Sequence, residues 1–420
     1  MSTRGLNVAR FMAGTPYWPV LSHPLLRRLL PGFVVSSLGD GMAVVAVSWL
    51  ALELTPATNR GLWVAGAVAA YTLPGAAGAL LLARFLRHRP PARLVGWDAT
   101  LRACALGAIP VAYVVGELSI GLYIALLGIS SVLHSWGQAG RYTLLARVLP
   151  ERNHLAGNAV LSTIGAASTV IGPALAGVLI AWHGAVLVIA LDAVTFVVLA
   201  ATFHFFAGPE AETSDPRPEH NAAEPPTPGK VSVIRGNPTL MGLLALSFGF
   251  FFLFGPVYVA LPLHVATDLH GSATLLAAFY TAFGSGALLG ATLTGYLNRW
   301  PLWPSTIGIV VGFGAVMLLV GLGVPTPVAL VSFALAGLLW PPYASMSTAL
   351  FQHSTTSRLL PQLLAANSSV RVLSVPLGTA LGGPLVGAVG AGPTLQLSAA
   401  AILALGLASA SAMALWASRS

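Results

Sequence analysis

Charged side chains stand inside long apolar stretches of this sequence. Asp40, Asp98, Arg102 and Arg371 are each flanked by runs of apolar residues. A charged side chain at the centre of a membrane helix costs on the order of 3 kcal/mol on insertion scales, so each of these residues needs a reason to be there. A carboxylate can carry a proton, and a guanidinium group can pair with a carboxylate or hold an anion. These residues are therefore the first candidates for chemistry.

Asp40 is the candidate for proton coupling. It lies near the middle of the apolar stretch 30–52, with Gly39 and two serines beside it. Because an apolar environment disfavours the charged form, such a carboxyl can take a proton from one side of a membrane and release it to the other. The alternative is a carboxyl neutralised by a fixed hydrogen bond or ion pair that stabilises the protein. The sequence leaves both open.

Asp98 and Arg102 are four residues apart, a spacing that sets both on one face of a helix. We place them near the cytoplasmic end of the stretch 94–115. The two side chains can neutralise each other, and the alternative is that they help to close an inner gate. Asp192, in the outer third of the stretch 185–206, is expected to interact with nearby polar groups or water.

Arg371 is the only basic side chain inside the apolar stretches of the second half of the chain. Those stretches hold no acid, because we expect Asp268 in an outer loop. An ionic partner for Arg371 must then come from the first half or from an anionic substrate. The sequence therefore predicts a role for Arg371 in gating or binding.

Twelve apolar stretches position these residues. Each is near the ~20 residues that a helix needs to cross a bilayer. They run over 30–52, 61–83, 94–115, 119–140, 156–181, 185–206, 239–263, 273–297, 304–323, 327–350, 363–389 and 393–417. The 420 residues are 56% hydrophobic and 8% charged, with a mean hydropathy of +0.82, whereas about 25% are charged in a typical soluble domain. The sequence predicts an all-α membrane protein of twelve transmembrane helices in two six-helix bundles.

The basic residues predict the topology. Most Lys and Arg residues fall in the segments before the first stretch, after the even-numbered stretches and in the middle loop. Such an excess marks the cytoplasmic face, so we expect a multi-pass protein of the plasma (inner) membrane with both termini cytoplasmic. The net charge of +8 then reflects orientation and not a nucleic-acid partner.

The two halves resemble each other around a polar linker. We divide the chain into a cytoplasmic segment (1–29), a first bundle (30–206), a disordered cytoplasmic linker (207–236) and a second bundle (237–418). Gly172-Pro173 recurs as Gly383-Pro384, and Tyr71-Thr72 as Tyr280-Thr281. Parallel repeats of this kind place a substrate site near the membrane midplane, between two halves that expose it alternately.

Several motifs carry a resemblance to a known family. They are Ser37-Leu38-Gly39-Asp40-Gly41, the arginine-rich second loop, Leu149-Pro150-Glu151-Arg152 and the segment Gly172 to Gly177. The chain resembles the transporters of the major facilitator superfamily, and among them the twelve-span bacterial exporters typified by macrolide efflux and enterobactin export proteins.

The sequence departs from two signatures of that family. In the loop after the second stretch Arg84 and Arg87 are kept, but both glycines and the acid are lost, which puts the usual gating in doubt. In the fifth stretch Gly172, Pro173 and Gly177 are kept. Small residues there still permit close helix packing, as at Gly383 and Pro384.

The resemblance implies that the first, fourth, seventh and tenth spans line the substrate cavity. The candidate cavity residues are Trp136, Gln138, Phe250, Phe254, Tyr258, Trp340 and Tyr343. The alternative is that this aromatic stripe serves packing or lipid contact. Pro341-Pro342 should kink or break the tenth helix.

We therefore expect a secondary active exporter that moves a hydrophobic or amphipathic small molecule, such as a drug, macrolide or siderophore, in exchange for protons by alternating access. An importer or facilitator is the alternative within transport, and an intramembrane enzyme or a channel are the rival classes. No ATP-binding loop or catalytic cluster is visible in the sequence. We expect no cofactor and no metal, with the lipid bilayer, the substrate and protons as partners of a monomer.

Overall fold

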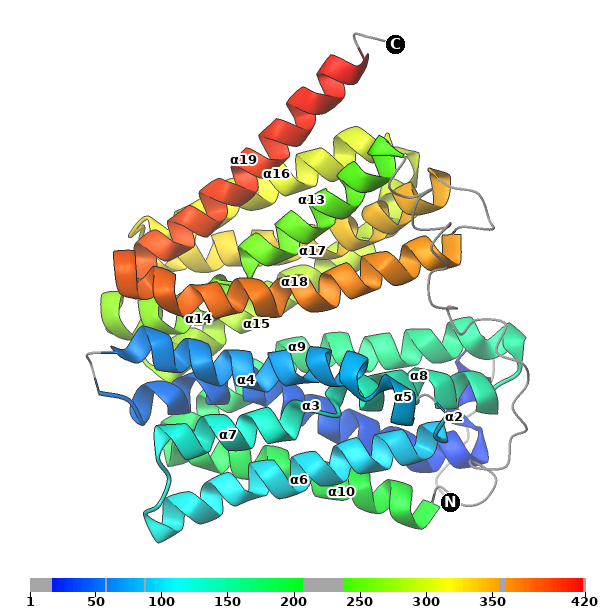
Figure 1. The fold of residues 1–420 in the computed structure, drawn as a ribbon, viewed down its shortest axis with the longest axis vertical. Coiled ribbons are helices and arrows are strands. Elements are labelled where there is room, and N and C mark those ends of the chain that lie inside the picture. The colour runs from blue at the N-terminus through cyan, green and yellow to red at the C-terminus, as the bar shows by residue number, and fades with distance from the viewer. Residues whose placement is uncertain (1–16, 57–58, 87, 207–236, 355–359, 418–420) are drawn as a thin grey trace, which may run out of the picture.

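Long helices run side by side through the molecule (Figure 1). The computed structural model describes residues 17–56, 59–86, 88–206, 237–354 and 360–417. Among the described residues, twelve helical segments are long and apolar enough to cross a membrane, and all the regular structure is helical. The prediction of an all-α membrane protein with twelve spans is confirmed. The linker 207–236 lies outside the described residues.

The first half holds six of these segments. Its helices are α2 (Trp18–Leu21), α3 (Pro24–Glu53), α4 (Arg60–Leu81), α5 (Ala83–Leu86), α6 (Pro91–Val115), α7 (Ile120–Ser131), α8 (His134–Val148), α9 (His154–His183) and α10 (Ala185–Phe206), with a 3-10 turn at Glu151–Asn153. In this half α10 packs against α3 and α6, and α9 packs against α3.

The second half holds the other six. Its helices are α13 (Pro238–Phe254), α14 (Val257–Leu263), α15 (Ala273–Thr294), α16 (Leu302–Gly321), α17 (Thr326–His353), α18 (Leu360–Val389) and α19 (Ala391–Ala417), with a π turn at His264–Asp268 and a 3-10 turn at Gly295–Arg299. Here α15 packs against α17, and α16 against α17 and α19.

Several helices extend beyond the predicted stretches because of their end residues. Pro24 and Pro91 open α3 and α6, where a missing N–H costs nothing. The Asn237 side chain caps α13, accepting hydrogen bonds from the backbone N–H groups of Thr239 and Leu240 at 3.0 and 3.3 Å. Gly116 ends α6 with a φ of 83°, in the left-handed region that favours glycine.

The fourth and seventh spans are each interrupted, which the sequence did not predict. The seventh breaks at Gly255 between α13 and α14, where the Gly255 backbone lies against that of Gly378 on α18. Thr379 donates a hydrogen bond to the Gly255 carbonyl at 3.1 Å and so stabilises the break. A side chain on residue 255 would overlap α18, so this close approach of the two helices requires glycine.

The tenth span, in contrast, is not broken at Pro341-Pro342. Helix α17 runs without interruption from Thr326 to His353, so a break there was the wrong prediction. The reason is close packing on α15, where Gly286 and Gly290 lie against the backbone of α17. That contact holds the helix in place where the prolines remove hydrogen bonds.

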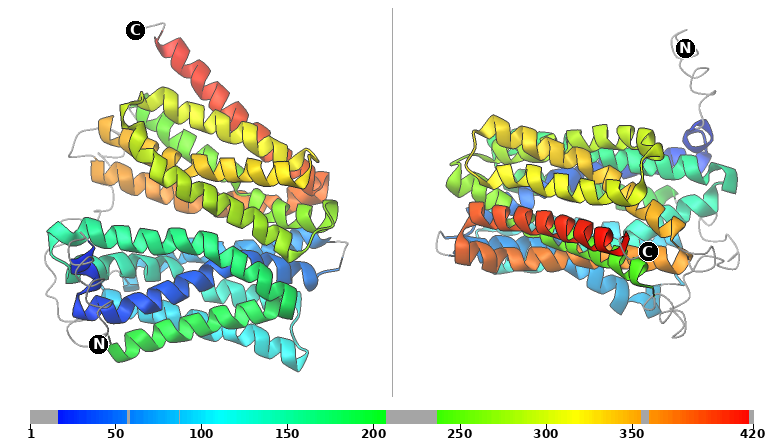
Figure 2. Two further views of the ribbon diagram at one scale, coloured as in Figure 1. Left: turned by 180° about the vertical axis from the view of Figure 1, so that it is seen from behind. Right: turned by 90° about the horizontal axis from the view of Figure 1, so that it is seen from above.

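The two halves form two layers that meet at one end of the molecule. In Figure 2 (left view) the layers lie together where α9 ends and α15 begins, and they diverge toward the opposite end. We call the end where the layers meet the closed end. We call the opposite end the linker end, because α10 ends and α13 begins there. At the closed end Thr274 donates to the Gly177 carbonyl at 3.3 Å.

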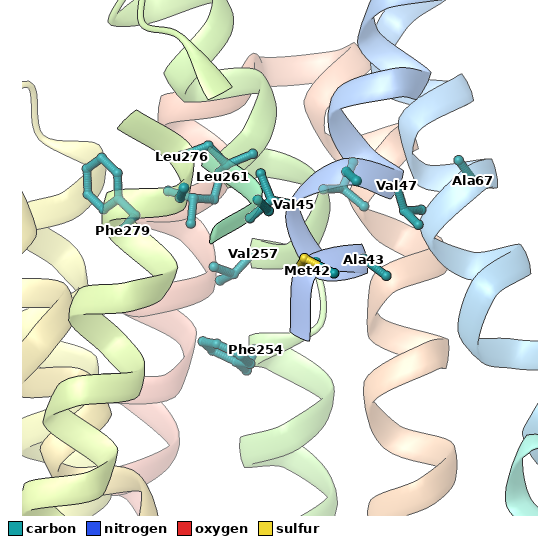
Figure 3. Packing of buried hydrophobic residues seen from close by; sticks show 14 of the residues in the cluster. Met42, Ala43, Val45, Val47, Ala67, Phe254, Val257, Leu261, Leu276 and Phe279 are labelled. Carbon is teal, nitrogen blue, oxygen red and sulfur yellow. The ribbon is translucent and has the colours of Figure 1, made fainter. Parts of the chain in front are cut away.

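The contact between the halves is mostly apolar. Figure 3 shows Met42 and Val45 of α3 beside Val257 and Leu261 of α14. Near the closed end, Gly383 of α18 faces Ala65 of α4. An ideal Cβ on Gly383 would lie 2.7 Å from the Ala65 Cβ. Small residues at this seam let the backbones of the two halves approach each other.

Candidate functional site

Arg102 is the centre of a buried charge cluster in the first half. Its side chain is 1% exposed, and its Nη1 donates to Asp40 Oδ1 of α3 at 2.5 Å. The Tyr71 hydroxyl of α4 donates to the same oxygen at 3.4 Å. Asp40 is therefore ion-paired, and 26% of its side chain remains exposed. The sequence predicted neither partner, because helix pairing decides which spans meet.

Arg102 lies at the middle of its helix, whereas the sequence led us to expect it near the cytoplasmic end of the span. Helix α6 begins at Pro91 and ends at Val115, so residue 102 is close to its midpoint. The prediction was wrong because proline opens the helix before the first strongly apolar residue. A role of Asp98 and Arg102 in gating stays a prediction.

Asp98 shares a helix face with Arg102, as the spacing predicts, but its carboxylate is not in hydrogen-bond contact with the guanidinium group. Asp98 Oδ1 is 3.8 Å from Arg102 Nε, and neither atom has a hydrogen-bond partner. The carboxyl of Asp98 lies against Gly137 of α8, where any side chain would overlap it. The stronger partner of Arg102 is Asp40.

Asp192 of α10 is the third carboxyl of the cluster and is 1% exposed. The Thr195 hydroxyl donates to its Oδ1 at 3.4 Å, in line with the expected polar contact. Its carboxyl also fills the space beside Gly39, the residue before Asp40. One turn further along α10, the ring of Phe196 lies 4.7 Å from the Arg102 guanidinium carbon.

Arg141 of α8 is a member that the sequence analysis missed, since it counted this residue with the loop after the fourth span. Because α8 extends to Val148, Arg141 lies inside the span and is 6% exposed. Its Nη2 donates to Ser36 Oγ at 3.5 Å. The signal was its spacing from His134, seven residues earlier, which puts both on one helix face. Both act electrostatically on Asp40.

The candidate cavity residues fall into two groups. Phe250, Phe254 and Tyr343 are almost fully buried and pack in an aromatic cluster, with the Phe250 and Tyr343 centroids 4.3 Å apart. Trp340 packs against Phe250 and Phe254 as well, and the place of these residues in a substrate cavity stays a prediction. Tyr258, Trp340 and Gln138 are partly exposed, as is Trp136, whose indole N–H donates to the Gly78 carbonyl at 2.9 Å.

Arg371 of α18 lies apart from the first cluster. It is partly buried, with its guanidinium carbon 4.9 Å from the Phe251 ring centroid. Within the described residues no carboxylate lies at ion-pair distance from it. Asp268, expected in an outer loop, instead ends the π turn of the seventh span, where it pairs with His264 at 2.7 Å.

The remaining candidates lie toward the ends of helices or between them. Arg84 of α5 stacks on Phe85 at 4.4 Å, and Arg87 lies outside the described residues. Gly172, next to Pro173, lies against the backbone of Gly41 on α3. Pro384 lines a cavity of about 560 Å³ at the closed end, together with Arg60 and Asp268. In the part of the chain described, no three His, Cys, Asp or Glu side chains are grouped to hold a metal ion.

Comparison with known proteins agrees with this architecture. The family model of the Major Facilitator Superfamily matches residues 29–379. The multidrug efflux pump Tap of Mycolicibacterium fortuitum is 25% identical over 400 residues, which cover 91% of this chain and 94% of that protein. The macrolide efflux protein A of Streptococcus pyogenes is 21% identical over 328 residues, covering 76% and 80%.

Solved structures share the fold at low identity. A bacterial homologue of the iron transporter ferroportin in an inward-facing state has a TM-score of 0.66 and 18% identity, covering 92% of this chain and 98% of that chain. A D-xylose-proton symporter has a TM-score of 0.68 and 11% identity, covering 93% and 97%. The matching family and these efflux relatives make the chain a multi-pass membrane transporter and not an enzyme, and it belongs to the major facilitator superfamily.

Proposed function

We propose that this transporter exports a hydrophobic or amphipathic small molecule, of the drug, macrolide or siderophore kind, in exchange for protons. The observation that carries the proposal is the buried cluster around Arg102, where Asp40 keeps 26% of its side chain exposed. Buried carboxyls that remain in reach of water are the groups that proton-driven carriers need. The relatives named as efflux pumps support the direction of transport.

The contact between the halves supports transport by alternating access. They meet at the closed end and diverge toward the linker end (Figure 2). On the positive-inside argument the linker end and both termini are cytoplasmic, so the halves diverge toward the cytoplasmic side. Rocking of the halves about the seam of small residues would expose Asp40 to the other side. Arg84, together with Arg87 of the same predicted loop, is the candidate for holding the inner gate.

The test is transport in everted membrane vesicles energised by respiration. Dyes, macrolides and siderophores are screened with and without a protonophore. Uptake that collapses with the protonophore establishes proton-driven export. Energised uptake that survives the protonophore contradicts proton coupling.

Import is the second candidate, because the structural neighbours include a D-xylose-proton symporter and a nucleoside transporter. Right-side-out vesicles separate the two directions. Energised uptake there, without uptake in everted vesicles, replaces export by import.

A further inference from the structure

We infer that Asp40 and Asp192 share one proton and compete for Arg102, so that Asp192 is a second proton site of the cluster. The inference deepens the proposed function by naming the partner of Asp40. It starts from Asp192, which is buried and has no part in the proposed function. Among the described residues, Asp192 has no Lys, Arg or His nitrogen within ion-pair distance.

The charged groups of the cluster do not balance when every acid is ionised. Tyr71 of α4 and Arg102 of α6 act electrostatically on both carboxyls, and Asp98 of α6 and His134 and Arg141 of α8 act on Asp40. The cluster thus holds three acids, two guanidinium groups and an imidazole, whose burial beside the two guanidinium groups favours its neutral form. With every acid ionised, one negative charge would be buried without a partner, which is costly. One proton on the acids makes the cluster neutral.

The hydrogen-bond partners of Asp40 and Asp192 indicate which acid holds this proton. Asp40 is closest to Arg102, at 2.5 Å. Among the side chains described, the Asp192 carboxyl accepts a hydrogen bond only from the hydroxyl of Thr195, at 3.4 Å. A neutral carboxylic acid suits such a position, whereas an ionised one would need a cation. In this conformation the proton is therefore on Asp192.

Arg102 lies near both acids. Asp192 lies against Gly39, the residue next to Asp40. The Phe196 ring, one turn from Asp192 on α10, lies 4.7 Å from the Arg102 guanidinium carbon. Arg102 Nε also has no hydrogen-bond partner, so part of its donor capacity is unused. A small movement of this side chain would exchange Asp40 for Asp192.

The exchange conserves protons and charge. When the partly exposed Asp40 takes a proton from water, one O–H bond forms there and Arg102 is released. Arg102 then pairs with Asp192, whose O–H bond breaks and whose proton leaves the cluster. The total stays at one proton in both arrangements, because zero or two would leave a net buried charge. Asp40 is the exposed entry point, and Asp192 is the buried store.

Infrared spectroscopy of the purified protein in lipid vesicles tests the shared proton directly. The carbonyl stretch of a protonated carboxylic acid should be present at neutral pH and should disappear in Asp192→Asn. It should also disappear in Asp40→Asn, because Arg102 then pairs with Asp192 and ionises it. Asp268→Asn is the matched control and should keep the band, because its carboxyl pairs with His264 in the other half and lies outside the cluster. A band that persists in Asp192→Asn overturns the inference.

Thermal stability gives a second, independent readout. Each single variant leaves Arg102 one close carboxylate, so the Tm of Asp192→Asn should stay within about 2 °C of the parent. The double variant Asp40→Asn/Asp192→Asn leaves only Asp98 and should lose more than the sum of the single losses. Asp40→Asn/Asp268→Asn, with acids in different halves, should be additive. Additivity in the first pair contradicts competition for Arg102.

Both measurements use the protein alone and need no substrate. Failure of energised transport in vesicles therefore counts against the proposed function and leaves this inference standing. Conversely, protonophore-sensitive transport that keeps its full proton dependence in Asp192→Asn overturns the inference while the proposed function stands.

Discussion

At the residue scale, an ion pair and a neutral acid can look alike in a sequence. Asp40 and Asp192 both stand in apolar spans, yet Asp40 lies 2.5 Å from a guanidinium nitrogen and Asp192 meets a hydroxyl. The ion pair favours the charged form of Asp40 in this conformation, and 26% of its side chain remains exposed. The chemistry of each acid thus depends on its neighbours.

Asp40→Asn should abolish proton-driven transport and leave the protein folded. The asparagine keeps the shape of the side chain but cannot exchange a proton or attract Arg102. The measurement is the pH dependence of transport in vesicles, with folding followed by thermal unfolding. Asp268→Asn serves as the control, since its carboxyl lies in the other half and pairs with His264. Unchanged pH dependence in Asp40→Asn would remove this residue as the coupling site.

Arg371→Ala should weaken transport of an anionic substrate far more than transport of a neutral one. Its guanidinium group stacks on Phe251 and meets no carboxylate at ion-pair distance among the described residues. Its charge is thus available to an anionic group. Transport of an anionic siderophore and of a neutral dye is compared in the same vesicles, with Arg371→Lys to test whether charge alone suffices. Equal loss on both compounds would point to a gating or structural role.

At the element scale, glycines decide how close the helices approach. The Gly172 backbone on α9 lies against Gly41 on α3, with an ideal Cβ only 2.6 Å from the Gly41 Cα. No side chain fits there unless the helices move apart. The seam between α9 and α3 sets the position of Asp40, because Gly41 is the residue after it.

Gly172→Val should therefore destabilise the protein by about 1–3 kcal/mol, the usual cost of overpacking. Gly165→Val is the matched control, because it lies in the same helix and an ideal Cβ there meets nothing within 4 Å. Thermal unfolding of the two variants in detergent measures the difference. Equal losses would mean that helix propensity, and not packing, is responsible.

At the scale of the whole molecule, the two layers meet at the closed end and must separate there if access alternates. Gly61 of α4 and Val386 of α18 face each other across this seam, with an ideal Gly61 Cβ 3.3 Å from the Val386 Cβ. That separation is near the range of disulfide bridges, about 3.5–4.5 Å between Cβ atoms. The seam can therefore be locked chemically.

The pair Gly61→Cys/Val386→Cys should form a disulfide that stops transport, with recovery after reduction. The background is Cys104→Ser, since Cys104 is the only native cysteine and is exposed. Each single cysteine variant controls for the substitutions themselves. Full transport by the oxidised protein would show that the closed end does not need to open.

The amino-acid sequence by itself determined the class of the protein and the number of its spans. Runs of about twenty apolar residues can satisfy their backbone groups in a membrane only as helices, and the placement of arginines predicted the orientation. The helical spacing also put Asp98 and Arg102 on one face. All of these are local properties of the chain, readable from composition and period.

Only the tertiary structure decided which helices meet. The ion pair of Asp40 with Arg102 joins residues 62 positions apart, and the position of Asp192 beside Gly39 joins α10 to α3. The burial of Arg141, the continuity of α17 through two prolines and the break at Gly255 likewise depend on neighbouring helices. The physical reason is that apolar spans can pack in many pairings, and close approach of small residues selects among them.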